Sequence, residues 1–325
     1  MDEQLPIYTD LGDVHGRATA FEQIADIHLA RGQYEDALRI FEDEVLPVVT
    51  RLGDRRSRAV ILGKIADIHR TRGRLDDALR ILTDEELPVY TRLGDTRSRA
   101  VTLGRIADIH FIRGQFDEAL RILSEEVIPV FTGLGDPRER AVALGKVADI
   151  HRARSHLDEA LQILSEDVLP TFTRLGDAQS RAVTLSKIAD IQVEYERYEG
   201  AHHTLTAEVL PLATALGDVR SQAVALGQLA EIDMIQGRFD EAFRMRSERE
   251  LPIYTRLGDR RAILICRAHI ADILARRGHP TDRPRIQLLL AQALSAARAM
   301  RLPEAATIES WQQQLGLPVG ETAPE

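Results

Sequence analysis

Hydrophobic residues recur with helical spacing in residues 54–73 and again in residues 75–94. In the first stretch they lie one, three or four positions apart, which indicates one broad apolar face of a helix. Asp54 is suited to capping the start of this helix, and Gly73 to ending it. The second stretch has the same spacing and ends at Gly94. The pattern predicts two consecutive helices of about 18 residues, each about 27 Å long.

The whole pattern returns every 41 residues. The dipeptide Gly-Asp begins at positions 12, 53, 94, 135, 176, 217 and 258, and a proline after Leu or Ile lies at 6, 47, 88, 129, 170, 211 and 252. Self-similarity at a fixed period is the sequence signature of a solenoid. We therefore predict an all-α fold, a right-handed α-solenoid of about seven antiparallel helix pairs over residues 1–279, with repeats starting near these Gly-Asp positions.

A proline lies inside each predicted second helix, as Pro88 does in the second repeat. It removes one backbone hydrogen bond, so a kink is expected near Asp84. The apolar spacing continues beyond the proline, which favours a bend over a break.

The two ends of the chain depart from the repeat. Residues 280–316 predict capping helices with Trp311 on the last one, and residues 317–325 predict a disordered tail. At the other end Leu5, Ile7 and Tyr8 belong to a second helix without its partner. We expect either self-association through this open edge or a larger protein from which the chain is a fragment.

The net charge, the length of apolar runs and the cysteine content indicate the compartment of the protein. The net charge is −9, no apolar run reaches 18 residues, and the start lacks the features of a signal peptide. The single Cys266 allows no internal disulfide. We expect a cytoplasmic protein without membrane contact, and the scarcity of lysine beside arginine suggests a bacterial genome.

The stretch "LGKIADIHRTRGRLDDALRIL" resembles the tetratricopeptide repeat family. The matching positions are Leu62, Ile65, Ala66, His69, Gly73, Ala78 and Leu82, in successive copies over about 12 to 279. The unit is longer than the family's usual 34 residues, and Glu85 stands where a small residue is usual. It is more similar to the extended repeats of kinesin light chain, Leu-Gly-Asn scaffolds and bacterial signalling regulators.

The resemblance implies a non-enzymatic scaffold whose first helices line a concave groove for a peptide or partner helix. The groove positions that it implies include Val60 and Thr71 in repeat two, and across the repeats they are Gly63, Lys64, Asp67, Arg70, Gly104, Arg105, Asp108, Gly145, Lys146, Asp149, Arg152, Lys187 and Asp190. Each glycine inside a helix costs about 1 kcal/mol relative to alanine, which indicates either close helix packing or a bare strip for a ligand. Lys64 and Asp67 form either an i, i+3 ion pair or part of a charged groove that binds a polar peptide.

Histidine and arginine also recur at fixed repeat positions, and each has both a structural and a functional interpretation. His28, His69, His110 and His151 occupy one repeat position, about 10 Å apart in packed helices, too far to share a metal. They are interpreted as structural or as a pH-sensitive core. The arginines at 17, 58, 99, 140 and 181 either form ion pairs or make a stripe that senses nucleic acid or a nucleotide messenger. No catalytic motif is present, so we predict no enzymatic activity and no cofactor.

Repeats five and six depart from the nearly identical repeats two to four. Repeat five has Tyr195 and Glu196 at its turn, and repeat six has Gln228, Met234 and Phe243. The divergence is either drift or a partner-specific end of the groove.

Overall fold

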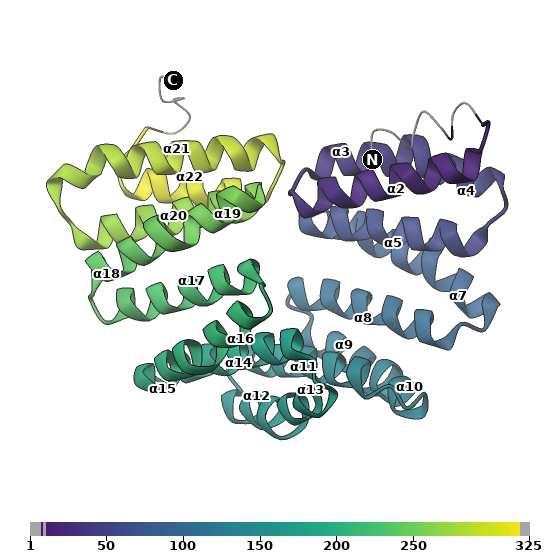
Figure 1. The fold of residues 1–325 in the computed structure, drawn as a ribbon, viewed down its shortest axis with the longest axis horizontal. Coiled ribbons are helices and arrows are strands. Elements are labelled where there is room, and N and C mark those ends of the chain that lie inside the picture. The colour runs from purple at the N-terminus through teal and green to yellow at the C-terminus, as the bar shows by residue number, and fades with distance from the viewer. Residues whose placement is uncertain (1–7, 9–10, 319–325) are drawn as a thin grey trace. The chain divides into compact units, whose positions relative to one another are not determined.

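The computed structural model describes residue 8 and residues 11–318, and every regular element among them is a helix. The chain divides into two compact units, Met1–Gly135 and Asp136–Glu325. Within each unit the helices follow one another as antiparallel pairs in repeat order (Figure 1). The predicted all-α solenoid is confirmed. Residues Leu5 and Ile7 of the expected open edge lie outside the described residues.

The first unit contains three complete repeats. Its elements are α2 (Val14–Ala30), α3 (Tyr34–Arg39), η1 (Ile40–Val45), α4 (Leu46–Arg51), α5 (Arg55–Thr71), α6 (Leu75–Arg80), η2 (Ile81–Glu86), α7 (Leu87–Leu93), α8 (Thr96–Ile112), α9 (Phe116–Arg121), η3 (Ile122–Val127) and α10 (Ile128–Gly133).

The second unit continues the same order and adds the final helices. Its elements are α11 (Pro137–Ala153), α12 (Leu157–Gln162), η4 (Ile163–Val168), α13 (Leu169–Leu175), α14 (Ala178–Glu194), α15 (Tyr198–His203), η5 (Thr204–Val209), α16 (Leu210–Ala215), α17 (Val219–Ile235), α18 (Phe239–Arg244), η6 (Met245–Glu250), α19 (Leu251–Leu257), α20 (Arg260–Arg277), η7 (Pro280–Asp282), α21 (Arg283–Ala299) and α22 (Glu304–Gln314).

The repeating aspartate starts each first helix, as the sequence predicts. The Asp54 carboxylate accepts a hydrogen bond from the backbone N–H of Ser57 at 3.0 Å. This contact satisfies one of the amide groups that a helix start leaves without a partner. At Asp136 the next residue is Pro137, which needs no such partner because it has no N–H.

The second helix of each repeat is continuous but changes its winding. A six-residue π-helical segment, such as η2, separates two short α-helices, and the backbone N–H of Leu87 donates to the carbonyl of Leu82. Pro88 follows immediately at the start of α7. Proline has no backbone N–H to donate, and here it stands where the π-helical segment meets α7. Because the winding is wider at this point, the helix continues through the proline. The simple bend predicted at Asp84 is thus replaced by a π-helical segment.

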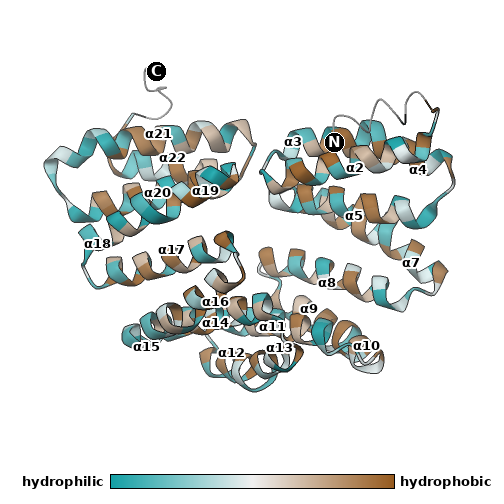
Figure 2. Ribbon diagram, in the orientation of Figure 1, coloured by the Kyte–Doolittle hydropathy of each residue, from teal (hydrophilic) through white to brown (hydrophobic). Residues whose placement is uncertain are grey.

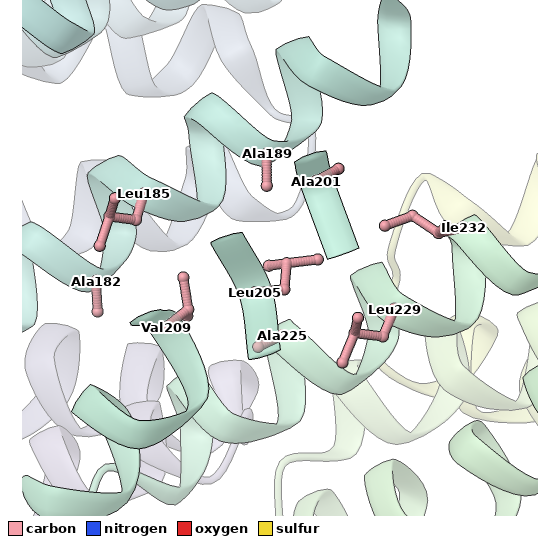
Figure 3. Packing of buried hydrophobic residues seen from close by; sticks show 9 residues of the cluster. All are labelled: Ala182, Leu185, Ala189, Ala201, Leu205, Val209, Ala225, Leu229 and Ile232. Atoms are coloured by element: carbon pink, nitrogen blue, oxygen red, sulfur yellow. The ribbon is translucent and has the colours of Figure 1, made fainter. Parts of the chain in front are cut away.

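The core of each repeat is built from small and branched apolar side chains. Helices carry hydrophobic and hydrophilic residues along their whole length (Figure 2). In the second unit one cluster joins Ala182, Leu185 and Ala189 of α14 to residues of α15, η5 and α17 (Figure 3). Fully buried alanines allow adjacent helices to approach closely, while leucines fill the space between them. This packing fixes the first helices beside one another.

The last two helices close the second unit. Helix α20 packs against α21, and α21 packs against α22. Leu317 is buried, and its backbone N–H donates to the carbonyl of Gln312. The remainder of the predicted tail, residues 319–325, lies outside the described residues.

Candidate binding groove

Charged side chains on the first helices pair with the helix of the preceding repeat. The Lys64 ammonium lies 2.8 Å from Asp26 Oδ1 and 2.9 Å from Glu22 Oε1, both on α2. Although burial disfavours its charge, these hydrogen bonds raise the pKa of Lys64. The expected i, i+3 pairing of Lys64 with Asp67 is therefore wrong, because packing brings a nearer carboxylate from the neighbouring repeat.

The same arrangement recurs in both units. Arg105 Nε lies 3.7 Å from Asp67 Oδ2, and the Lys187 ammonium lies 2.7 Å from Asp149 Oδ2. Such ion pairs between helices fix long side chains at defined places.

A row of exposed valines lies beside these charges. Val60, Val183 and Val224 occupy one repeat position and remain 40%, 48% and 43% exposed. They lie four residues before Lys64, Lys187 and Gln228, respectively. Residues four apart share one face of a helix. We call this repeat position of the first helices, within each unit by itself, the valine row. The first helices thus offer apolar contact next to fixed charges.

Gly63 makes room for an ion pair between the buried Glu86 and the partly exposed Arg105. A Cβ at this position would lie 2.4 Å from an Arg105 guanidinium nitrogen and 2.8 Å from Glu86 Oε2. Glu86 is 2% exposed and accepts hydrogen bonds from Thr102 Oγ1 at 3.0 Å and from Arg105 at 3.2 Å. Burial raises the pKa of the Glu86 carboxyl. A side chain at position 63 is therefore excluded by the guanidinium group of Arg105, which belongs to the next repeat.

A cavity in the second unit combines apolar and charged walls. It has a volume of about 450 Å³ and is lined by residues of the first helices α11, α14, α17 and α20. Further lining residues come from η5, η6 and α19. Its polar residues include Arg152 and Asp190, which the sequence assigns to the groove. Ala189 and Leu205 of the cluster in Figure 3 also line it. We call it the repeat-six pocket.

A buried ion pair forms one wall of the repeat-six pocket. Arg246 donates to Glu250 Oε2 at 2.8 Å, and their side chains are only 5% and 6% exposed. A second guanidinium nitrogen of Arg246 lies 3.6 Å from Glu231 Oε2. Burial raises the pKa of Glu250, while Arg246 partly offsets this effect. A buried pair of this kind is costly to separate, because either partner alone would be an unpaired charge.

The opposite wall combines charged and neutral groups. Gln228 donates to Asp190 Oδ1 at 2.7 Å and to the carbonyl of Ser186 at 3.1 Å. Arg152 donates to Glu194 Oε1 at 2.5 Å and to Asp190 Oδ2 at 3.3 Å. Burial raises the pKa of Asp190. Gln228 therefore occupies the place of the lysine or arginine in earlier repeats.

Residues 16–85 match the family model described as tetratricopeptide repeat. Together with the repeated helix pairs, this match decides the fold type. The chain has a tetratricopeptide-like α-solenoid fold. No curated protein sequence matches it.

Solved structures share the fold of the tetratricopeptide-type array at low sequence identity. Aspartyl phosphate phosphatase F from Bacillus subtilis aligns with a TM-score of 0.61 at 13% identity, over 98% of this chain and 77% of that chain. A Rap protein complexed with Competence and Sporulation Factor aligns with a TM-score of 0.58 at 12% identity, over 97% of both chains.

A third structure is a longer protein. The Signal Transduction ATPase with Numerous Domains protein with a tetratricopeptide repeat sensor, from Pyrococcus horikoshii, aligns with a TM-score of 0.57 at 15% identity. The alignment covers 92% of this array and 48% of that chain, so the array spans about half of its length.

The remaining predicted groove residues of the tetratricopeptide-type array lie on first helices. Gly104 and Asp108 lie on α8, and Gly145 and Lys146 lie on α11. Arg70 Nε lies 3.6 Å from Asp67 Oδ1, an i, i+3 contact.

The repeating arginines of the array are paired with acids on the second helix of their own repeat. Arg58 lies 2.7 Å from Glu85, and Arg99 lies 3.2 Å from Glu126. Arg181 makes the equivalent contact at 3.5 Å.

The histidines of the array have separate environments. His28 hydrogen-bonds Gln33, while His69 is buried and burial lowers its pKa. In the described part of the chain, no group of three His, Cys, Asp or Glu side chains is arranged to hold a metal ion. Nor does that part contain a helix long and apolar enough to cross a bilayer.

Sequence reasoning missed Arg246, Glu250, Glu231 and His269 of the repeat-six pocket. A signal was available for the first two. Arg246 stands where four earlier repeats have Leu and one has Phe, and Glu250 stands where most earlier repeats have Val. A charged residue at a repeat position that is otherwise apolar marks a change in the core.

Proposed function

We propose that the array is a non-enzymatic interaction scaffold that holds an extended peptide or a partner helix along its first helices. The observation that supports this proposal is the valine row beside charges already fixed by ion pairs. An exposed apolar row gives contact area, and the fixed charges set the orientation of a partner. A pre-formed surface also avoids the entropic cost of ordering side chains during binding.

The alternative function is recognition of nucleic acid or a nucleotide messenger by the arginines. It would require Arg58 and Arg99 to exchange their contacts with Glu85 and Glu126 for phosphates. A strong loss of binding with rising salt is the measurable consequence of such contacts. The net charge of −9 opposes this alternative.

The scaffold proposal predicts that changes in the valine row abolish partner capture. The double variant Val60→Asp and Val183→Asp places one charge on the valine row of each unit, outside the repeat-six pocket and without touching the core. The full chain is used as bait in native lysate at moderate salt, and bound protein is quantified. We expect the double variant to lose at least 90% of a protein that the unchanged array captures stoichiometrically, since a desolvated charge opposes apolar contact.

The matched control is Leu175→Asp, which introduces the same side chain at a residue 42% exposed at the end of α13, on a second helix. It is expected to retain capture. Equal capture by all variants, or captured nucleic acid in place of protein, would contradict the proposal.

A further inference from the structure

The two units contain the same buried acid in different surroundings. Glu250 lies four repeats after Glu86, and Gly227 lies four repeats after Gly63. A Cβ on Gly227 would lie 3.0 Å from Glu250 Oε1, as the equivalent atom on Gly63 would approach Glu86. The chain thus contains an internal comparison for the repeat-six pocket.

In the first unit an arginine of the array lies between two carboxylates. Arg105 contacts Asp67 at 3.7 Å and Glu86 at 3.2 Å. Its guanidinium group therefore has two carboxylate partners, and it occupies the space that Gly63, lacking a side chain, leaves open.

In the second unit both acids remain, but their guanidinium partner comes from another element, because Arg246 on η6 lies beside Gly227. Glu231 occupies the repeat position of Asp67, Glu250 that of Glu86, and His269 that of Arg105. All three line the repeat-six pocket. The pocket therefore opens beside His269, at the repeat position that carries Arg105 in the first unit.

Arg246 replaces Arg105 as the partner of these two acids, yet the pocket as a whole keeps more acids than guanidinium groups. Arg246 reaches Glu250 and Glu231 from the second helix, at the repeat position of Leu82. Among the described residues that line the pocket are four carboxylates, Asp190, Glu194, Glu231 and Glu250, and two guanidinium groups, Arg152 and Arg246. His269 adds no charge near pH 7, because burial and the nearby Arg246 lower its pKa to about 4.

The pocket also offers an acceptor and an apolar rim. In the described structure Gln228 Oε1 is buried and accepts no hydrogen bond. A buried acceptor without a donor is unfavourable until a ligand supplies one. Val193, Val224, Ile235 and Ile265 line the same space and suit the aliphatic part of a long basic side chain.

We propose that the repeat-six pocket binds the side chain of an arginine that a partner protein presents between apolar residues. This inference rests on the proposed function and adds the residue type that is recognised. The guanidinium group donates to the carboxylates and to Gln228, and its planar shape suits carboxylate recognition. The flanking apolar residues contact the rim.

The first test compares two peptides that differ in charge alone. Acetyl-Leu-Arg-Leu-amide and the same peptide with citrulline in place of arginine are titrated into the full chain by calorimetry. Citrulline keeps nearly the same shape but is neutral. We expect the arginine peptide to bind at least tenfold more tightly, and equal affinities would overturn the inference.

The second test fills the pocket from within the chain. His269→Arg supplies the guanidinium group at the place that Arg105 has in the first unit, so it is expected to weaken the arginine peptide at least tenfold. His202→Arg adds the same charge on an exposed part of α15 and is the matched control. Equal affinities of these two variants would overturn the inference.

A milder variant covers the case in which His269→Arg does not fold. Glu231 is 45% exposed, so Glu231→Gln removes one carboxylate without opening the core. It is expected to weaken the arginine peptide at least threefold and to leave the citrulline peptide unchanged. An unchanged arginine peptide contradicts the inference.

The scaffold proposal and this inference fail in different ways. If the valine-row variant loses partner capture but the peptides do not differ, the scaffold stands and the arginine pocket is wrong. If the peptides differ as expected but the valine-row variant retains capture, the pocket stands as a binding site and the extended groove is wrong.

Discussion

At the residue scale, two glycines at one repeat position have different neighbours. A Cβ on Gly63 would overlap the Arg105–Glu86 pair, whereas a Cβ on Gly145 would have the Lys187 ammonium 3.8 Å away as its neighbour. Both replacements by alanine gain about 1 kcal/mol of helix propensity. The surroundings therefore decide whether that gain is kept.

We expect Gly145→Ala to stabilise the protein by about 0.5 to 1 kcal/mol. Gly63→Ala is expected to destabilise it by about 1 to 3 kcal/mol, because the new methyl group separates the buried Glu86 from its partner Arg105. Urea unfolding of both variants measures the difference, and a stabilised Gly63→Ala would contradict the described contact.

His269 gives a second prediction at the same scale. Its pKa is about 4 in the folded protein and about 6.5 in an unfolded chain, so the unfolded chain binds more protons between these values. The stability that neutral His269 contributes is complete above pH 6.5 and is lost as the pH falls towards 4. Arg246 and Glu250 on η6, Glu231 on α17 and Asp272 on α20 are the charged groups near the ring.

The measurement compares the unfolding free energy of the unchanged protein with that of His269→Gln. The acids near the ring are common to both proteins, so their own titration largely cancels. We expect the unchanged protein to lose at most about 3 kcal/mol relative to the variant between pH 7 and pH 4. A difference that does not vary with pH would show that His269 is not held neutral.

At the element scale, local signals predict the first helices well and the second helices less well. Asp54 and its repeats define the helix starts because capping depends on residues three positions apart. The π-helical segment before Pro88 has no equally local signal.

The aspartate cap can be tested directly. Asp54→Ala removes the hydrogen bond to the Ser57 N–H and is expected to lower the unfolding free energy by about 1 kcal/mol. Asp54→Asn, which retains an acceptor, is expected to stay within about 0.3 kcal/mol of the unchanged protein. If both variants lose the same stability, charge and not capping is the important property.

At the scale of the whole chain, the repeat was evident from the sequence and the pairing was not. Lys64 and Asp67 are neighbours along one helix, yet Lys64 contacts Asp26, which lies 38 residues earlier. Helical spacing alone cannot identify a partner on another helix. The repeat pattern marks Arg246 and Glu250 as charges at mostly apolar positions, but only the packing of η6 against α17 places them at the repeat-six pocket.

The ion pairs between successive first helices have an evolutionary consequence. Because Lys64 and Arg105 each contact an acid of the repeat before them, loss of residues 54–94 would bring Arg105 opposite Asp26, and the charges would still match. At these positions the gene can therefore lose repeat two without creating a like-charge contact. This interchangeability ends at Gln228, where the neutral amide makes the repeat non-equivalent to those before it.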